Sequence, residues 1–130
     1  MIELAAHLAN LPTGAMHTIN QDSLDLKPSP DSPPSKTLPA TSCHETLDRF
    51  DKNITDALAV IADASDEHLL SSWTLLSGGK VIFELRRVAV LRNFVMNHNI
   101  HHRAQLGVYL RLNDVAVPAI YGQSTDEGSI

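Results

Sequence analysis

A proline-rich segment divides the chain into two parts that no single helix or strand can join. Residues 27–41 contain five prolines, at positions 28, 30, 33, 34 and 39, mixed with serine, aspartate and lysine. Proline lacks a backbone N–H and its ring clashes with the helical turn before it, so regular helix or central strand is excluded here. A long connection inside a small domain is typical of a crossover between the two ends of a helical bundle. We therefore expect residues 27–41 to be a crossover loop.

The composition is that of one globular domain spanning residues 1–130. Apolar residues make up 43% and charged residues 19% of the chain, enough for one core. The formal net charge of −5 argues against a broad nucleic-acid interface. No apolar run reaches the roughly 18 residues of a membrane span, and no basic segment followed by an apolar one opens the chain. We expect a cytoplasmic protein that binds neither nucleic acid nor membranes, with its one cysteine, Cys43, unpaired.

Helical periodicity accounts for most of the chain. Apolar spacing predicts helices over residues 2–11, 15–26, 42–63 and 85–112, with a short helical turn over 65–70. Ser42 followed by Glu45 has the spacing of a capping box. The apolar stripe expected on that helix consists of Leu47, Phe50, Ile54, Leu58 and Ile61.

The segment between the last two helices leaves two interpretations open. Residues 73–76 and 80–83 flank Ser77-Gly78-Gly79 and can pair as a small hairpin, or the segment is an irregular excursion. Three substantial helices and a crossover indicate an all-α bundle. Such a bundle leaves part of its apolar seam uncovered, and we expect the second copy of a homodimer or a further N-terminal helix to cover it.

Three of the seven histidines lie in the segment Asn97-His98-Asn99-Ile100-His101-His102-Arg103. His98 and His102 are four residues apart, which places them on one helix face with Cβ atoms roughly 5–6 Å apart. Imidazoles at that distance can converge on one divalent cation. His101 lies about 60° from His98 around the helix, so the spacing favours His102 without excluding His101.

The pattern around these histidines predicts that they face the core. The expected inward stripe is Val88, Leu91, Val95, His98, His102, Gln105 or Leu106, and Tyr109. Buried imidazoles need hydrogen-bond partners or a metal ion, because an unsatisfied buried polar group is costly. A pair of core histidines and a metal site both remain possible from spacing alone.

Other polar residues carry weaker indications. Histidines without a partner at helical spacing are expected to face solvent or cap helices: His17, His44 and His68. Arg103 and Gln105 are interpreted as helix-surface residues, with orientation of a bound anion as the alternative. Asp126 and Glu127 are interpreted as part of a solvated tail, with a hydrogen bond to a metal-ligating imidazole as the alternative.

Four segments of the chain match motifs of one known family. Residues 97–111 are similar to the pattern His-x-x-His-His-Arg-Gly-Gln-Leu…Tyr-Leu-Arg. Val117-Pro118 and residues 121–127 resemble a closing Val-Pro…Tyr-Gly-Pro-Ser-Ala-Asp-Glu, and residues 4–8 resemble Leu-x-x-His-Leu. The chain thus resembles the DinB superfamily of metal-binding four-helix bundles. The resemblance implies a DinB-like up-down bundle, with no counterpart of the family's first helix ahead of Met1.

The resemblance also implies a metal site and a chemistry. Carried over residue by residue, it makes His7, His98 and His102 the ligands of a divalent ion, which could be Zn, Ni, Fe or Mn. Three protein ligands leave a position for water or substrate. The implied function is that of a metal-dependent enzyme, a thiol S-transferase or hydrolase, with a low-molecular-weight thiol and an electrophile as substrates. The alternative is a non-catalytic metal-binding stress or damage-response module, in which the ion ties the first and last helices together.

Overall fold

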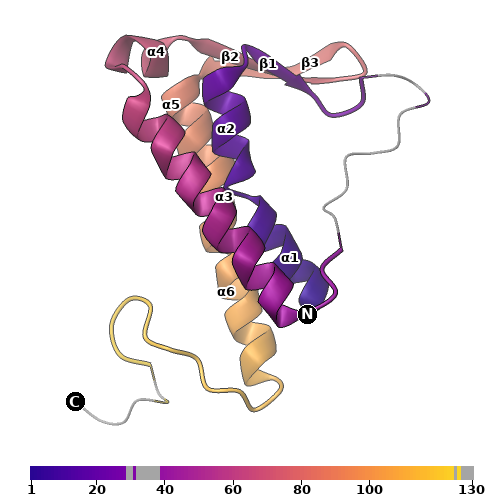
Figure 1. Cartoon of the computed structure of the whole chain (residues 1–130), viewed down its shortest axis with the longest axis vertical. Coiled ribbons are helices and arrows are strands. Elements are labelled where there is room, and N and C mark those ends of the chain that lie inside the picture. Colours follow the sequence, from indigo (N-terminus) through magenta and orange to yellow (C-terminus); the bar gives the residue numbers. More distant parts are fainter. Residues whose placement is uncertain (29–30, 32–38, 125, 127–130) are drawn as a thin grey trace.

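The chain forms three helical rods with a small sheet lying across one end (Figure 1). The computed structural model describes residues 1–28, 31, 39–124 and 126. The helices are α1 (Ile2–Asn10), α2 (Thr13–Asn20), α3 (Cys43–Asp63), α4 (Asp66–Leu70), α5 (Arg87–Val90), the π-helix η1 (Leu91–Met96) and α6 (Asn97–Arg111). The strands are β1 (Ser23–Asp25), β2 (Ser72–Ser77) and β3 (Lys80–Arg86). None of the described helices is long and apolar enough to cross a membrane.

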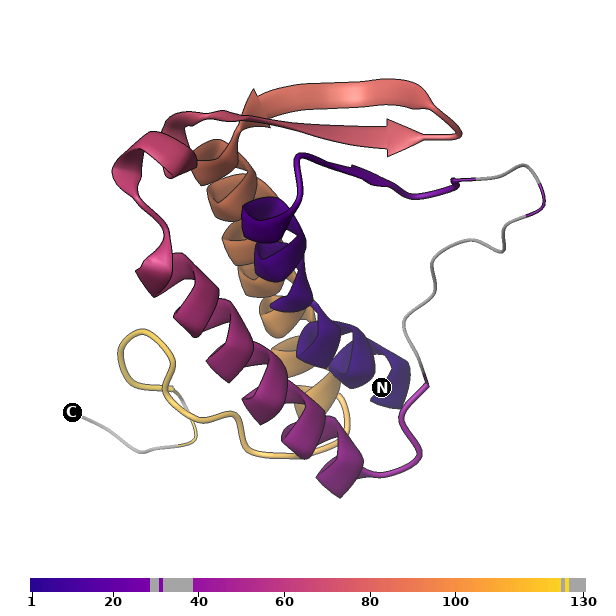
Figure 2. The same cartoon turned by 45° about the horizontal axis from the view of Figure 1, so that its top comes forward.

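The rods run in two directions. The α1–α2 rod and α3 both run toward the sheet, and the α5–η1–α6 rod runs away from it (Figure 1, Figure 2). Because β1 lies at the sheet end and α3 begins at the opposite end, the connection between them has to span the bundle. Most of the predicted crossover, residues 27–41, lies outside the described residues.

The predicted helical fold is confirmed in part: the described residues are mostly helical, but they include a three-stranded sheet in the order β1-β2-β3, so the fold is not all-α. The hairpin interpretation of residues 73–83 is confirmed, with β2 and β3 antiparallel. The helix expected over residues 15–26 ends at Asn20, and Ser23–Asp25 pairs in parallel with β2 instead. Leu24 packs there against the buried cluster of Trp73, Leu75 and Val90, so tertiary packing outweighs the local helical pattern.

The start of α3 follows its sequence signals with one shift. The Ser42 side chain accepts a hydrogen bond from the backbone N–H of Glu45 (3.1 Å), as a helix cap does. The Glu45 carboxylate accepts from the backbone N–H of Thr41 (2.8 Å), one residue earlier than in a capping box. Farther along the helix, the Asn53 side chain donates to the Ala9 carbonyl oxygen (2.9 Å). This bond links α3 to the last turn of α1.

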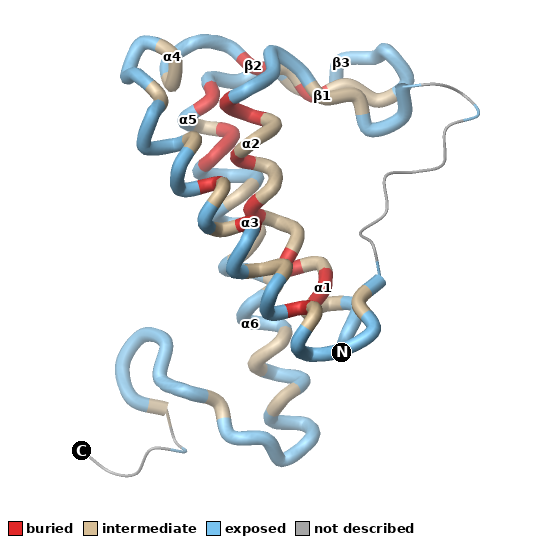
Figure 3. Tube along the Cα trace, in the orientation of Figure 1, coloured by how far each residue is buried: buried red, intermediate tan, exposed pale blue. Residues whose placement is uncertain are grey.

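The face by which α3 packs is not the predicted apolar stripe. The buried residues of α3 are Thr46, Asn53 and Ala57, whereas Leu47 is 61% and Leu58 60% exposed. Small side chains on the buried face allow α3 to lie close to α1 and α2. Leu47 and Phe50 line an open apolar groove of about 240 Å³, to which α1 and α6 also contribute residues. Most residues of α3 and all residues of α6 are exposed or only partly buried (Figure 3).

The last rod departs from a uniform α-helix. Leu85 and Arg86, predicted as helical, belong to β3, and Leu91–Met96 is a π-helix. A π segment adds a residue to the turn and so shifts the buried stripe before it. Val90 is therefore buried and Val88 is 44% exposed, contrary to the prediction. Tyr109, predicted in the core, is 49% exposed. No residue of α6 is buried.

A buried arginine holds the sheet end together. Arg87 is 2% exposed, and its Nη2 donates to Asp22 Oδ1 (2.7 Å) and to the Gln21 carbonyl oxygen (3.1 Å). Its Nη1 donates to the Ser72 carbonyl oxygen. Nε2 of His68 lies 3.1 Å from Arg87 Nε and 2.8 Å from the Ile19 carbonyl oxygen, so His68 is half-buried rather than facing solvent as predicted.

Candidate metal centre

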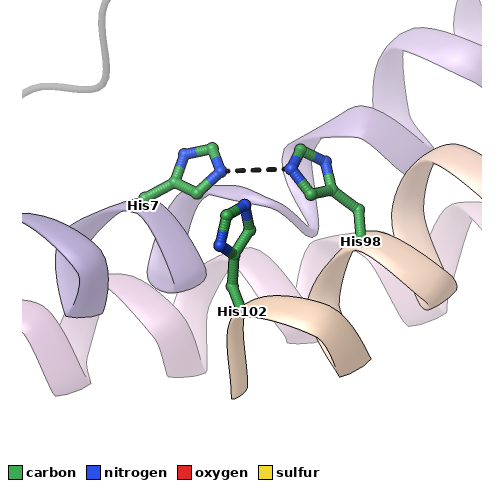
Figure 4. A group of neighbouring side chains, drawn as sticks. All are labelled: His7, His98 and His102. Carbon is green, nitrogen blue, oxygen red and sulfur yellow. Dashed lines mark hydrogen bonds between the residues drawn. The ribbon is translucent and has the colours of Figure 1, made fainter. Parts of the chain in front are cut away.

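Three histidines from opposite ends of the chain meet between α1 and α6. His7 comes from α1, and His98 and His102 come from α6 (Figure 4). The Nε2 atoms of His7 and His98 are 3.4 Å apart. One ligand nitrogen from each of the three rings lies within 4.8 Å of the others. We call His7, His98 and His102 the imidazole triad.

The triad has the composition and spacing of a metal site. Two imidazole nitrogens bound about 2.0–2.1 Å from one tetrahedral zinc ion lie roughly 3.3–3.4 Å apart. The His7–His98 separation of 3.4 Å already equals that value. The ring centroid of His102 lies 4.6 Å from that of His7 and 4.7 Å from that of His98, and the ligand atoms of all three residues lie within 4.8 Å of one another. The residues therefore fit a divalent ion.

Helix α6 supplies two members of the triad, because His98 and His102 lie four residues apart on one face. The structure also shows which of the neighbouring residues His101 and His102 lies beside His7. His102 faces His7 with ring centroids 4.6 Å apart. His101 is exposed, and its ring centroid lies 4.8 Å from that of His102. The structure thus groups His102, and not His101, with His7 and His98.

Gln105 fixes the orientation of His102, a role that the sequence interpretation missed. Nδ1 of His102 lies 2.6 Å from Gln105 Oε1. Because an amide oxygen only accepts, Nδ1 carries the proton and Nε2 is left without one for a metal. The signal was present in the spacing, since residues three apart on a helix lie side by side. Gln105 is thus part of the site rather than an uninvolved surface residue.

The surroundings favour neutral imidazoles. Burial lowers the pKa of His7 below its ordinary value, and the neighbouring His102 and His98 lower it further. The pKa of His98 is also lowered, by burial first and then by His102, with His101 adding to the effect and a backbone hydrogen bond with Phe94 opposing it. Neutral imidazole is the form that binds metal ions. The lowered pKa values of His7 and His98 therefore favour the metal-binding form of these two imidazoles near neutral pH.

A cavity of about 440 Å³ adjoins the triad. His7 and His98 line one end of it, and its walls come from α1 and α2 on one side and from the sheet and the α5–η1 segment on the other. Trp73 and Phe94 contribute aromatic walls, and His17 lines it as well instead of facing solvent. Sequence patterns did not indicate this cavity, because its walls depend on how the sheet packs across the helices.

The remaining candidate residues lie away from the triad. Asp126 pairs with Arg111 (2.8 Å) and accepts the Val117 backbone N–H (2.9 Å), so it is not a partner of a ligand imidazole. Glu127 lies outside the described residues. Arg103 is exposed and borders the apolar groove, and Cys43 is exposed at the start of α3. Neither Arg103 nor Cys43 belongs to the imidazole triad.

Comparison with known proteins gives one match. The family model described as "DinB family" matches residues 38–129, well over half of the chain. The matched region contains His98 and His102, whereas His7 precedes it. No curated protein and no solved structure shows a significant match.

Proposed function

The chain belongs to the DinB family, and from that premise we propose that it is a divalent-metal-dependent enzyme that activates a small thiol or a water molecule. The observation that carries the proposal is the imidazole triad at one end of the cavity. When a divalent ion is bound, it supplies Lewis-acid chemistry that lowers the pKa of a thiol or water in contact with it to near neutrality. The proposed activity is that of a thiol S-transferase or hydrolase.

The protein's own residues have separate parts in this proposal. His7, His98 and His102 would hold the ion, and Gln105 keeps His102 in the tautomer that presents Nε2. The triad contains neither carboxylate nor thiolate, so it would leave the full positive charge of the ion to act on a substrate. His7 and His98 line the cavity, so a substrate in the cavity would approach the site from their side.

A second candidate function rests on a different observation. The helix that carries His98 and His102, α6, contains no buried residue. An ion bridging His7 and the α6 histidines would tie α1 to α6, and its binding free energy would then contribute to folding. On this alternative the chain is a non-catalytic metal-binding module in a stress or damage response.

Turnover distinguishes the two functions. We would load the folded protein with zinc, nickel, iron or manganese and follow consumption of a thiol panel, from cysteamine to glutathione, with an electrophile such as chlorodinitrobenzene. The enzyme proposal predicts metal-dependent consumption that His98→Ala abolishes. A folded, metal-loaded sample that turns over none of the thiols supports the structural module instead.

A further inference from the structure

The cavity beside the triad has the size and walls of a small-molecule site. Its volume of about 440 Å³ lies within the range of ligand pockets. Much of its wall is apolar, from Leu11, Leu24, Leu75, Val90 and Val95. The indole N–H of Trp73 donates to the His17 carbonyl oxygen (3.3 Å), so the rest of that ring offers apolar surface.

A row of aromatic rings leads from the sheet to the triad. Ring centroids are 6.2 Å apart between Trp73 and Phe83, 5.1 Å between Phe83 and Phe94, and 6.5 Å between Phe94 and His98. Trp73 and Phe94 in this row line the cavity itself. Rings at such separations form surfaces on which the flat or branched body of a ligand can pack.

Among the described residues, the charged side chains that line the cavity are acidic rather than basic. Asp25 is among the residues that line it, and no lysine or arginine is, within the part of the chain that the structure describes. The Asp25 carboxylate is fixed by the backbone N–H groups of Lys27 (2.8 Å), Gly78 (2.9 Å) and Gly79 (2.8 Å). These bonds, that from Lys27 first, lower the pKa of Asp25, so it is ionised near neutral pH.

We propose that this cavity binds a small uncharged or amine-bearing molecule with an aromatic or branched apolar body, and that it disfavours ligands carrying carboxylates. Among the described residues that line the cavity, a carboxylate would find the anionic Asp25 and no lysine or arginine to pair with. An amine would instead gain an anionic neighbour. This inference deepens the proposed function: the thiol substrate would be one without acidic groups.

The chain offers a built-in reporter for the test. Trp73 is the only tryptophan, so intrinsic fluorescence reports on this cavity wall. We would titrate the zinc-loaded protein with 2-phenylethylamine, 2-phenylethanol and phenylacetate, which share a ring and differ in the end group. We expect the amine and the alcohol to bind at least about tenfold more tightly than the acid. Any attraction of the zinc ion for a carboxylate works against this result, which makes the comparison conservative.

Two variants separate the effect of the charge of the cavity wall from the effect of its aromatic surface. His17→Lys puts a cation into the wall and should raise phenylacetate affinity at least about fivefold while lowering that of the amine. Phe94→Leu keeps an apolar side chain and should weaken all three ligands alike, because it removes the aromatic face. Zinc is present in every arm, so its own contribution cancels between variants.

The outcomes are separable from those of the proposed function. Equal binding of the acid and the amine, or no saturable binding of any probe to folded protein, would overturn the inference. Metal content is measured on the same samples. Selective binding by a protein that fails to retain metal would leave the inference standing while the proposed enzyme fails. Turnover of glutathione by a protein that binds phenylacetate as tightly as 2-phenylethylamine would support the proposed enzyme and overturn the inference about the cavity.

Discussion

The Nε2 atoms of His7 and His98 lie 3.4 Å apart, although 91 residues separate the two histidines in the sequence. The contact joins α1 to α6, a helix that contains no buried residue. Burial lowers the pKa of both imidazoles, which keeps them neutral near pH 7.

Replacing Gln105 should weaken metal binding without unfolding the protein. Gln105→Leu removes the acceptor 2.6 Å from His102 Nδ1, so His102 loses its fixed tautomer. Loss of such a partner typically costs about 10–100-fold in metal affinity. Competition with a chromophoric chelator measures the effect, and Gln105→Glu, which keeps the acceptor, should restore tight binding. Arg103→Leu, an exposed change on the same helix, is the control; equal affinities for all the proteins would refute the role of Gln105.

Replacing Arg87 should strongly destabilise the fold. Arg87→Met removes the donor to the Gln21 and Ser72 carbonyl oxygens and the ion-pair partner of Asp22. We expect the free energy of unfolding in urea to fall by about 2–4 kcal/mol. Arg86→Met, an exposed neighbour of the same chemistry, should change it by less than about 0.5 kcal/mol. Similar losses for both variants would show that the buried network contributes little.

The stability contributed by Asp25 should depend on pH. Its pKa in the folded protein lies below the ordinary value, chiefly because of the backbone N–H of Lys27. Its contribution is therefore present above the ordinary pKa of about 4 and is lost as the pH falls through the folded value. Comparing urea midpoints of wild type and Asp25→Asn from pH 7 to pH 3 should show a gap that closes on acidification. A gap that is constant, or that widens toward pH 3, contradicts the assignment.

The homodimer expected from the sequence stays a prediction, and the apolar groove between α3 and α6 is where a second copy would bind. The segment from Arg87 to Arg111 contains arginines and no acidic residue, whereas α3 carries more acidic than basic side chains. A second copy can therefore match α3 of one chain with α6 of the other. Sedimentation should show a dimer that Leu47→Glu converts to monomer and that Ala59→Glu, on another face of α3, leaves intact. A wild-type monomer at high concentration would contradict this prediction.

Periodicity predicted the helices well, and it failed where distant segments determine the structure. Residues 23–25 read as the end of a helix, but Leu24 fills the cluster around Trp73 and pairs with β2. The predicted stripe of α3 also failed, because Thr46, Asn53 and Ala57 make the closer fit to the other helices. Apolar spacing shows that a face exists, and packing decides which neighbour covers it.

The residues of the site were easier to anticipate than its surroundings. His98 and His102 share a face because of helical spacing, and the structure places His7 beside them, as the family resemblance implied. Gln105 lies three residues after His102, so helical spacing could also have predicted their contact. The sequence analysis instead interpreted Gln105 as a helix-surface residue. The cavity depends on the sheet, whose first strand had no sequence signal of its own. No sequence pattern within β1 or within η1 predicts that the two segments line the same cavity.

Metal stoichiometry of matched variants tests the central claim most directly. Wild type, His7→Ala, His98→Ala, His102→Ala and the neighbouring control His101→Ala would be dialysed against zinc and analysed by inductively coupled plasma mass spectrometry, with circular dichroism to confirm folding. We predict one zinc ion per chain in wild type and His101→Ala, and loss of at least about tenfold in affinity in each triad variant. Full zinc binding by folded His7→Ala would contradict a site shared between the two ends of the chain.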